Sequence, residues 1–126
     1  MKKLHKVSEA EKKIMNIIWS YPRPVTTAEI LNELPEDKTW KQTTVITFLA
    51  RLIEKGFVSA VRVGKANHYT ANLTEQEYIN LETKQFIQDV HQGSVSGLIS
   101  ALCDNGDLMK EDIEELMTRL KNRGEI

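Results

Sequence analysis

Three threonines and one arginine, spaced between residues 43 and 51, could recognise the base edges and phosphates of a nucleic acid. Placed on a helix, the stretch from 39 to 56 (TWKQTTVITFLARLIEKG) turns a polar face to one side, made of Thr43, Thr44, Thr47 and Arg51. Threonine offers a donor, an acceptor and a methyl group that can meet thymine, and arginine offers a bidentate fork for guanine or a phosphate. This short polar face is suited to the DNA major groove.

The other side of the same helix is apolar, and we expect it to pack into a hydrophobic core. It is formed by Val45, Leu49, Leu52 and Ile53. Thr39 and Gln42 form a T-x-x-Q pattern that predicts a capping box at its start. Lys55 and Gly56 supply a cation and then a residue that tolerates a left-handed stop. We expect Lys41 and the amides of the first turn to meet a phosphate.

Two shorter helices are expected before this one. An S-x-x-E box at Ser8 opens a helix that carries Ile14, Ile17, Ile18 and Tyr21 and ends before two prolines. A second box, Thr26 with Glu29, opens a short helix closed by Pro35. A helix, a short helix, a tight link and a longer helix make up the helix-turn-helix plan.

Beyond Gly56 the apolar period changes from 3.6 to 2, which predicts a hairpin of strands 57–63 and 68–71 around a turn at 64–67. A hairpin directly after a helix-turn-helix is a wing. Arg62 and Lys65 lie at or near its tip, where they could reach phosphates. The alternative is a hairpin that only covers the core and leaves these charges in water.

The rear of the chain predicts three amphipathic helices. They begin at the Thr74–Glu77 capping box, after Gly93, and near Lys110, and the last is stopped by Gly124. So small a helical unit is marginal alone, and a second copy would bury its apolar stripes. We therefore predict a homodimer, with folding back on the front domain as the alternative. The candidate dimerisation residues are Tyr78, Leu81, Phe86, Val90, Leu98, Ile99, Leu102, Ile113, Leu116, Met117 and Leu120.

The net charge of −1 hides two opposite halves. Residues 1–72 contain 12 Lys/Arg and 7 Asp/Glu, a net of +5, whereas residues 73–126 contain 5 and 11, a net of −6. The basic N-terminal part favours binding to a polyanion, and the acidic C-terminal part favours a different function. We predict a mainly α fold with a small β-hairpin: a winged helix-turn-helix DNA-binding domain over 1–72 and a helical dimerisation domain over 73–126.

Other classes of function find no support in the sequence. There is no apolar run of the roughly 20 residues that span a bilayer and no signal core, so we expect a cytoplasmic protein without membrane insertion. His5, His68 and His91 lie on different predicted elements, and no metal or cofactor is expected. No nucleophile–base pair or phosphate loop predicts an enzyme. We expect the single cysteine, Cys103, to be a small core residue, with redox sensing as the alternative.

The chain resembles the family of penicillinase and methicillin-resistance repressors, which also includes copper-responsive repressors. The resemblance covers nearly the whole length. It rests on Ala10–Glu11 and Ile14–Trp19, on Trp40, Thr44–Val45, Thr47, Leu49, Arg51–Leu52 and Lys55–Phe57, on His68–Tyr69, and on Asp112–Leu116 with Leu120.

The resemblance implies a winged-helix repressor that dimerises through its C-terminal helices, binds palindromic operators with TACA and TGTA half-sites, and represses resistance genes. Some members carry a basic residue where this chain has Thr43 and Ile46. The β-lactam-responsive members are cleaved after an asparagine, but the corresponding bond here, Ala101–Leu102, lacks it. The cysteine-rich tail of the copper-responsive members is also missing.

The function predicted is a dimeric repressor that binds a palindromic operator in double-stranded DNA, in a β-lactam-type resistance operon. The alternative is a winged-helix module that binds protein without operator binding. The sequence leaves open whether a membrane sensor-protease pathway acts upstream.

Overall fold

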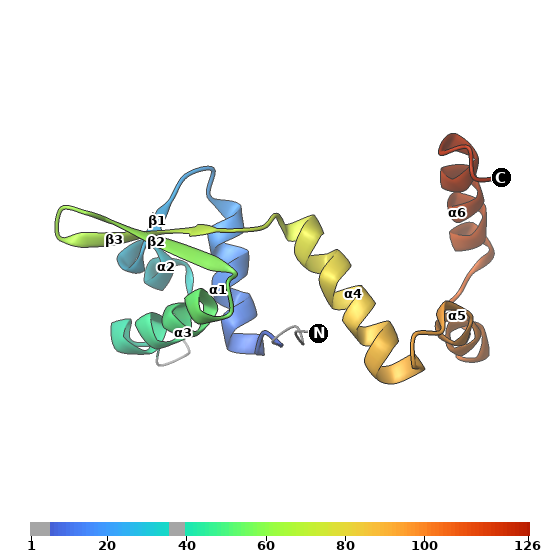
Figure 1. Cartoon of the computed structure of the whole chain (residues 1–126), viewed down its shortest axis with the longest axis horizontal. Helices are drawn as coiled ribbons and strands as arrows, with labels where there is room; N and C mark the ends of the chain where they lie inside the picture. The colour runs from blue at the N-terminus through green and yellow to red at the C-terminus, as the bar shows by residue number, and fades with distance from the viewer. Residues whose placement is uncertain (1–5, 36–39) are drawn as a thin grey trace. The chain divides into compact units, whose positions relative to one another are not determined.

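The computed structural model describes residues 6–35 and 40–126 (Figure 1). The chain divides into two compact units, Met1–Asn80 and Leu81–Ile126. In chain order the elements are α1 (Glu9–Ser20), β1 (Val25–Thr26), α2 (Thr27–Glu33), α3 (Gln42–Glu54), β2 (Val58–Val63), β3 (Ala66–Ala71), α4 (Glu75–His91), α5 (Val95–Asp104) and α6 (Lys110–Asn122). The fold is therefore mainly helical with a small sheet, as predicted.

Capping boxes start α1 and α2 where the sequence predicted them. The backbone N–H of Glu11 donates to the Ser8 hydroxyl at 3.1 Å, and the Ser8 N–H donates to the Glu11 carboxylate at 2.8 Å. Thr26 and Glu29 repeat the arrangement at 3.2 and 3.0 Å. Helix α1 ends at Ser20. Tyr21, which was predicted to belong to the helix, is its C-cap instead. Pro22 follows directly, and a residue before proline is driven out of the helical region.

The sheet has the order β1-β3-β2, with antiparallel pairs throughout. Its hairpin turn is tighter than predicted. Because Ala66 and Asn67 already pair with Val63 and Arg62, only Gly64 and Lys65 form the turn. Gly64 has a φ of +65°, a conformation that a two-residue turn asks of its first central residue and that glycine adopts without strain. The hairpin extends beyond the helices at the left of Figure 1.

The core of the first unit is built from α1, α2, α3 and the sheet. Its buried members are Ile14, Met15, Ile18, Val25, Ile30, Leu34, Val45, Leu49, Leu52, Phe57, Val58 and Tyr69. Strand β1 joins this core through Val25, which is fully buried and lies opposite Tyr69. The apolar face predicted for the third helix is thus confirmed at three of its four residues, and Ile53 is the exception at 41% exposed.

Helix α3 starts later than predicted. Its N-cap is Lys41, without a side-chain cap, and Gln42 is its first residue. The predicted Thr39–Gln42 box is wrong because Gln42 cannot be the third residue of the helix, and Thr39 itself lies outside the described residues. Trp40 precedes the cap and packs against the core, with its ring centroid 5.6 Å from that of Phe48. This contact packs the residue before the N-cap onto the second turn of the helix.

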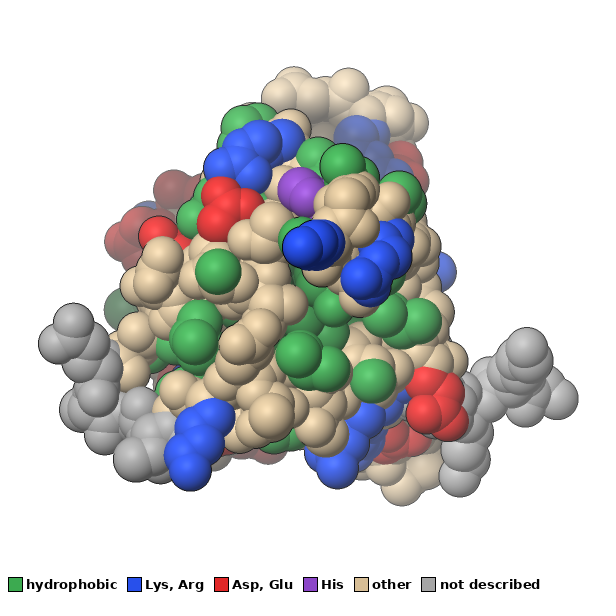
Figure 2. Space-filling view, turned by 90° about the vertical axis from the view of Figure 1, so that its left-hand side faces the viewer, with side chains coloured by type: hydrophobic (Ala, Val, Ile, Leu, Met, Phe, Trp, Pro, Cys, Tyr) green, Lys and Arg blue, Asp and Glu red, His purple; other side chains and the backbone are tan. Residues whose placement is uncertain are grey.

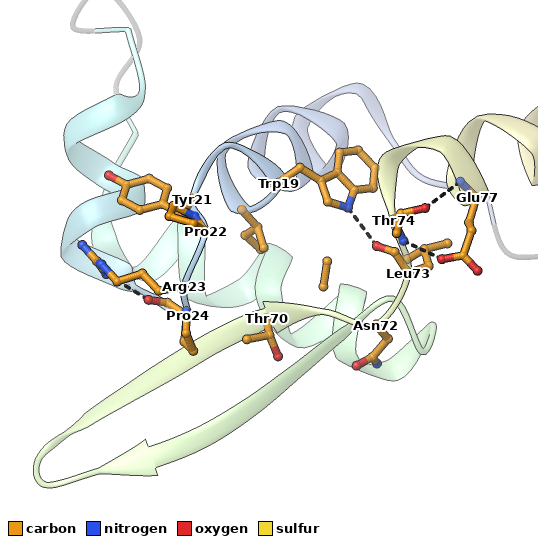
Figure 3. Close-up of a pocket in the computed structure, with 12 residues that line it drawn as sticks. Trp19, Tyr21, Pro22, Arg23, Pro24, Thr70, Asn72, Leu73, Thr74 and Glu77 are labelled. Carbon is orange, nitrogen blue, oxygen red and sulfur yellow. Dashed lines mark hydrogen bonds between the residues drawn. The ribbon is translucent and has the colours of Figure 1, made fainter.

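The junction between β3 and α4 is held by Trp19, whose Nε1–H donates to the Leu73 carbonyl at 3.0 Å (Figure 3). Next to it, the Thr74–Glu77 capping box forms as predicted, at 2.9 and 3.0 Å. An open pocket of about 410 Å³ lies here, and these residues line it together with Tyr21, Arg23 and Thr70. Trp19 with Leu73 and Thr74 with Glu77 form hydrogen-bonded pairs in its wall.

Candidate nucleic-acid interface

Helix α3 presents two chemically different faces. Val45, Leu49 and Leu52 are at most 1% exposed. On the opposite side Thr43, Thr47 and Arg51 are exposed, and Thr44 is half-buried. The structure therefore brings the four predicted α3 residues to the accessible side of one helix.

Local contacts order this accessible face. The Thr47 hydroxyl donates to the Thr43 carbonyl at 2.9 Å, so its proton is used within the helix, while its methyl group and acceptor lone pairs stay available. The Arg51 guanidinium lies 5.5 Å from the centroid of the Phe48 ring, a cation–π distance. Phe48 is a supporting residue that the sequence reasoning missed, although its position three residues before Arg51 is a readable helix neighbour pair.

Two further cations belong to the hairpin. Lys65 lies in the turn and Arg62 pairs with Asn67 across the strands, and both side chains are exposed. The N-terminal half of α3 and the hairpin tip both face the left side of Figure 1. Seen from that side, Lys and Arg side chains stand among polar and hydrophobic ones (Figure 2). Lys41, also exposed, is the N-cap of α3, where free backbone N–H groups attract anions.

Two acidic groups of the first unit, Glu11 and Glu29, form ion pairs with Lys55 and Arg23. The hydrogen bonds from the Arg23 guanidinium lower the pKa of Glu29 to about 2. Burial raises the pKa of Glu11, but hydrogen bonds from Lys55 and Ser8 outweigh it and leave that pKa below its ordinary value. The first turn of α3 contains no acid. The N-cap and first two turns of α3 and the hairpin turn thus carry exposed cations and no acid.

The predicted dimerisation residues fall into two groups. Tyr78 is only 6% exposed, because its ring packs against Trp19 and Phe57 at 5.3 and 6.0 Å between centroids. It contributes to the first unit, and the prediction that it serves dimerisation is replaced by this role. The others are exposed or half-buried: Leu81, Phe86, Val90, Leu98, Ile99, Leu102, Ile113, Leu116, Met117 and Leu120.

Helices α5 and α6 contain no buried residue. On α6 the ion pairs Lys110–Glu114 and Glu115–Arg119 lie off the stripe that carries Leu116 and its apolar neighbours. Cys103 is exposed, so its predicted place in a core is wrong. It lies near the end of a short amphipathic helix whose apolar side is not covered within this chain. The Ala101–Leu102 bond lies inside α5, with both side chains half-buried.

Residues 6–35 and 40–126 contain no cluster of three or more His, Cys, Asp or Glu side chains that could hold a metal ion. Across the same residues, each helix is too short or too polar to cross a bilayer. The chemically distinctive surface of the described chain is thus the α3 face with the hairpin tip.

Comparison with known proteins shows the family of the chain. The family model described as penicillinase repressor matches residues 7–122. The chain belongs to the penicillinase repressor family. Members of this family are transcriptional repressors and not enzymes.

Two relatives match nearly the full length of the chain, and a solved structure matches its front part. The penicillinase repressor of Bacillus licheniformis is 33% identical over 126 residues, which is 98% of either chain. The methicillin resistance regulatory protein MecI of Staphylococcus aureus is 30% identical over 121 residues, 96% of this chain and 98% of that one. The solution structure of the DNA binding domain of the repressor BlaI aligns with a TM-score of 0.52 and 37% identity, covering 62% of this chain and 94% of that chain.

Proposed function

We propose that this member of the penicillinase repressor family is a homodimeric repressor that binds a palindromic operator, in an operon of the β-lactam resistance type. Residues 1–72 would form the DNA-binding domain and residues 73–126 the dimerisation domain. One observation carries the proposal: the accessible side of α3 carries threonines and an arginine, while its other side is buried in the core.

Each polar residue has a role in this proposal. Thr43, Thr44 and Thr47 contact base edges or nearby phosphates, since a helix in the major groove reads bases with its N-terminal residues. Arg51 anchors the DNA backbone, and its support on the Phe48 ring limits the freedom lost on binding. Arg62 and Lys65 contact phosphates beside the groove. Lys41 and the amides at the start of α3 hold a phosphate through the helix dipole.

Dimerisation is supported by the uncovered apolar residues of the second unit. Helices α5 and α6 are amphipathic but bury no side chain within the chain, and large apolar residues such as Phe86, Ile99 and Leu116 are 42–49% exposed. A second copy would cover these stripes, and its two-fold symmetry would match a palindrome with half-sites about one helical turn apart.

The proposal is tested by selecting bound duplexes from random DNA with the full chain and measuring affinity against salt. We expect an enriched inverted repeat. If four cations in each protomer contact phosphates, counterion release predicts a slope of log K against log salt of about −7 for the dimer. Selection of no sequence, together with a shallow slope, would favour a winged-helix module that binds protein.

A further inference from the structure

Helix α3 exposes an isoleucine on the side that carries the threonines. Ile46 is 44% exposed, although every other large aliphatic residue in the first two turns of α3, namely Val45 and Leu49, is at most 1% exposed. Ile46 therefore adds little to the core. Its position between Thr43 and Thr47 in the sequence, and one turn before the exposed Ala50, places it on the accessible face.

The groups around Ile46 are mostly methyl groups. Thr43, Ile46, Thr47 and Ala50 are three or four residues apart in pairs, a spacing that brings Cβ atoms to about 5–6 Å. The Thr47 hydroxyl already donates its proton to the Thr43 carbonyl, so Thr47 offers its methyl group and an acceptor but no donor on this face. The centre of this face is thus less polar than its sequence suggests.

The surroundings of this methyl-rich patch indicate what it meets. Lys41 and Arg51 are exposed at the two ends of this stretch of α3, Arg62 and Lys65 are exposed on the hairpin, and the first turn of α3 carries no acid, so the charges complement a polyanion. On a DNA duplex, the apolar group displayed at base edges in the major groove is the 5-methyl group of thymine.

Resting on the proposed function, we propose that Ile46 is a specificity-determining residue that packs against the 5-methyl group of a thymine in the operator. Packing on a methyl favours thymine over cytosine at that base, because cytosine offers only hydrogen there and also presents an amino donor that an isoleucine cannot accept. Ile46 thereby adds an apolar preference to the polar contacts of the threonines.

The chain provides a matched control on the same helix. Ile53 is 41% exposed and lies seven residues further along, on nearly the same stripe. Seven residues correspond to about 10 Å along the helix axis, so Ile53 does not reach the base that Ile46 contacts when the N-terminal half of α3 enters the groove.

The experiment uses a duplex selected from random DNA by the full-length protein, in which thymines are replaced one at a time by uracil. Uracil lacks the 5-methyl group and keeps every hydrogen-bonding group. At one thymine per half-site we expect wild-type affinity to fall about fourfold, the factor expected for one buried methyl group. Ile46→Ala should bind the thymine and uracil forms equally, whereas Ile53→Ala should keep the wild-type ratio.

Two results would overturn the proposal while leaving the proposed function intact. One is a wild-type protein that prefers its selected duplex over a scrambled one but is indifferent to uracil at every position. The other is an Ile46→Ala protein that keeps the wild-type thymine preference. If the wild type prefers no sequence at all, the proposed function fails and the inference fails with it.

Discussion

The carboxylate Oε1 of Glu11 lies 2.8 Å from Nζ of Lys55, and this contact joins the first turn of α1 to the C-cap of α3. Glu11 is 1% exposed although it is charged. The same ammonium also donates to the Lys6 carbonyl at 2.7 Å. The ion pair therefore ties α1 to the end of the helix that we propose to read DNA.

Lys55→Met should lower the free energy of unfolding of the first unit by about 3 kcal/mol at neutral pH, because it leaves a buried carboxylate without its cation. Urea unfolding followed by tryptophan fluorescence measures this, since Trp19 and Trp40 both lie in the first unit. Lys65→Met is the control: this lysine is exposed in the hairpin turn, and its loss should change stability by less than about 0.5 kcal/mol. Equal effects of the two substitutions would show that the ion pair does not stabilise the fold.

The effect of Lys55→Met should depend on pH. Because the folded state holds the pKa of Glu11 below its ordinary value of 4.5, the pair stabilises the protein above that pH and loses its effect as pH falls through the lowered pKa. The difference in unfolding free energy between wild type and variant should therefore be largest at pH 6–7 and shrink below about 4.5. Urea titrations at several pH values measure it, and a difference independent of pH would contradict the role given to Glu11.

The stabilising effect of Glu29, tested by Glu29→Gln, should persist to lower pH than that of Glu11. The Arg23 hydrogen bonds lower the pKa of Glu29 to about 2, so the contribution of this carboxylate is complete above its ordinary pKa of 4.5 and disappears only as pH falls through about 2. Wild type and variant should thus differ at pH 5 and converge near pH 2. If wild type and variant have the same unfolding free energy at pH 5 as well as at pH 2, the exposed pair is screened and contributes nothing measurable.

The existence of helices α1, α2 and α3 and of the hairpin follows from the sequence because local signals determine them. Apolar residues at helical spacing mark the buried face of α3, and the capping boxes at Ser8 and Thr26 mark two helix starts. The candidate DNA face then follows by exclusion, since a helix with one side buried must leave the other accessible.

What could not be predicted depends on contacts between distant residues. Strand β1 has only two residues, too few to show the apolar–polar alternation that predicts a strand, and it forms because Val25 pairs with Tyr69. Helix α3 starts without a side-chain cap, so no capping pattern marks its first residue. The Glu11–Lys55 pair joins residues 44 positions apart, and neither residue's local sequence reveals it.

Thr44→Ala should relax sequence preference, because its loss removes a base-edge contact worth about 1 kcal/mol of discrimination. Lys65→Ala should instead weaken binding to all duplexes alike and reduce the salt slope by about 1 per protomer. Competition between the selected duplex and a scrambled one, at two salt concentrations, separates the two effects. Our assignment of roles is wrong if Lys65→Ala changes the preference or Thr44→Ala leaves it intact.

Leu116→Asp should weaken self-association by about 2 kcal/mol or more, since it puts a charge in the middle of the apolar stripe of α6. Thr118→Asp adds the same charge to the same helix away from the stripe and should have little effect. Sedimentation equilibrium over a range of concentrations gives both dissociation constants. A wild type that stays monomeric, or two variants that behave alike, would argue against a dimer built on this surface.

The most direct test of the central claim is an NMR titration of the ¹⁵N-labelled full chain with its selected duplex. We predict that the largest amide shift changes fall in residues 41–51 of the α3 region and around Arg62 and Lys65, with much smaller changes along α1. Changes concentrated on α1 or α2, with α3 and the hairpin tip unaffected, would contradict the assignment of this surface to DNA.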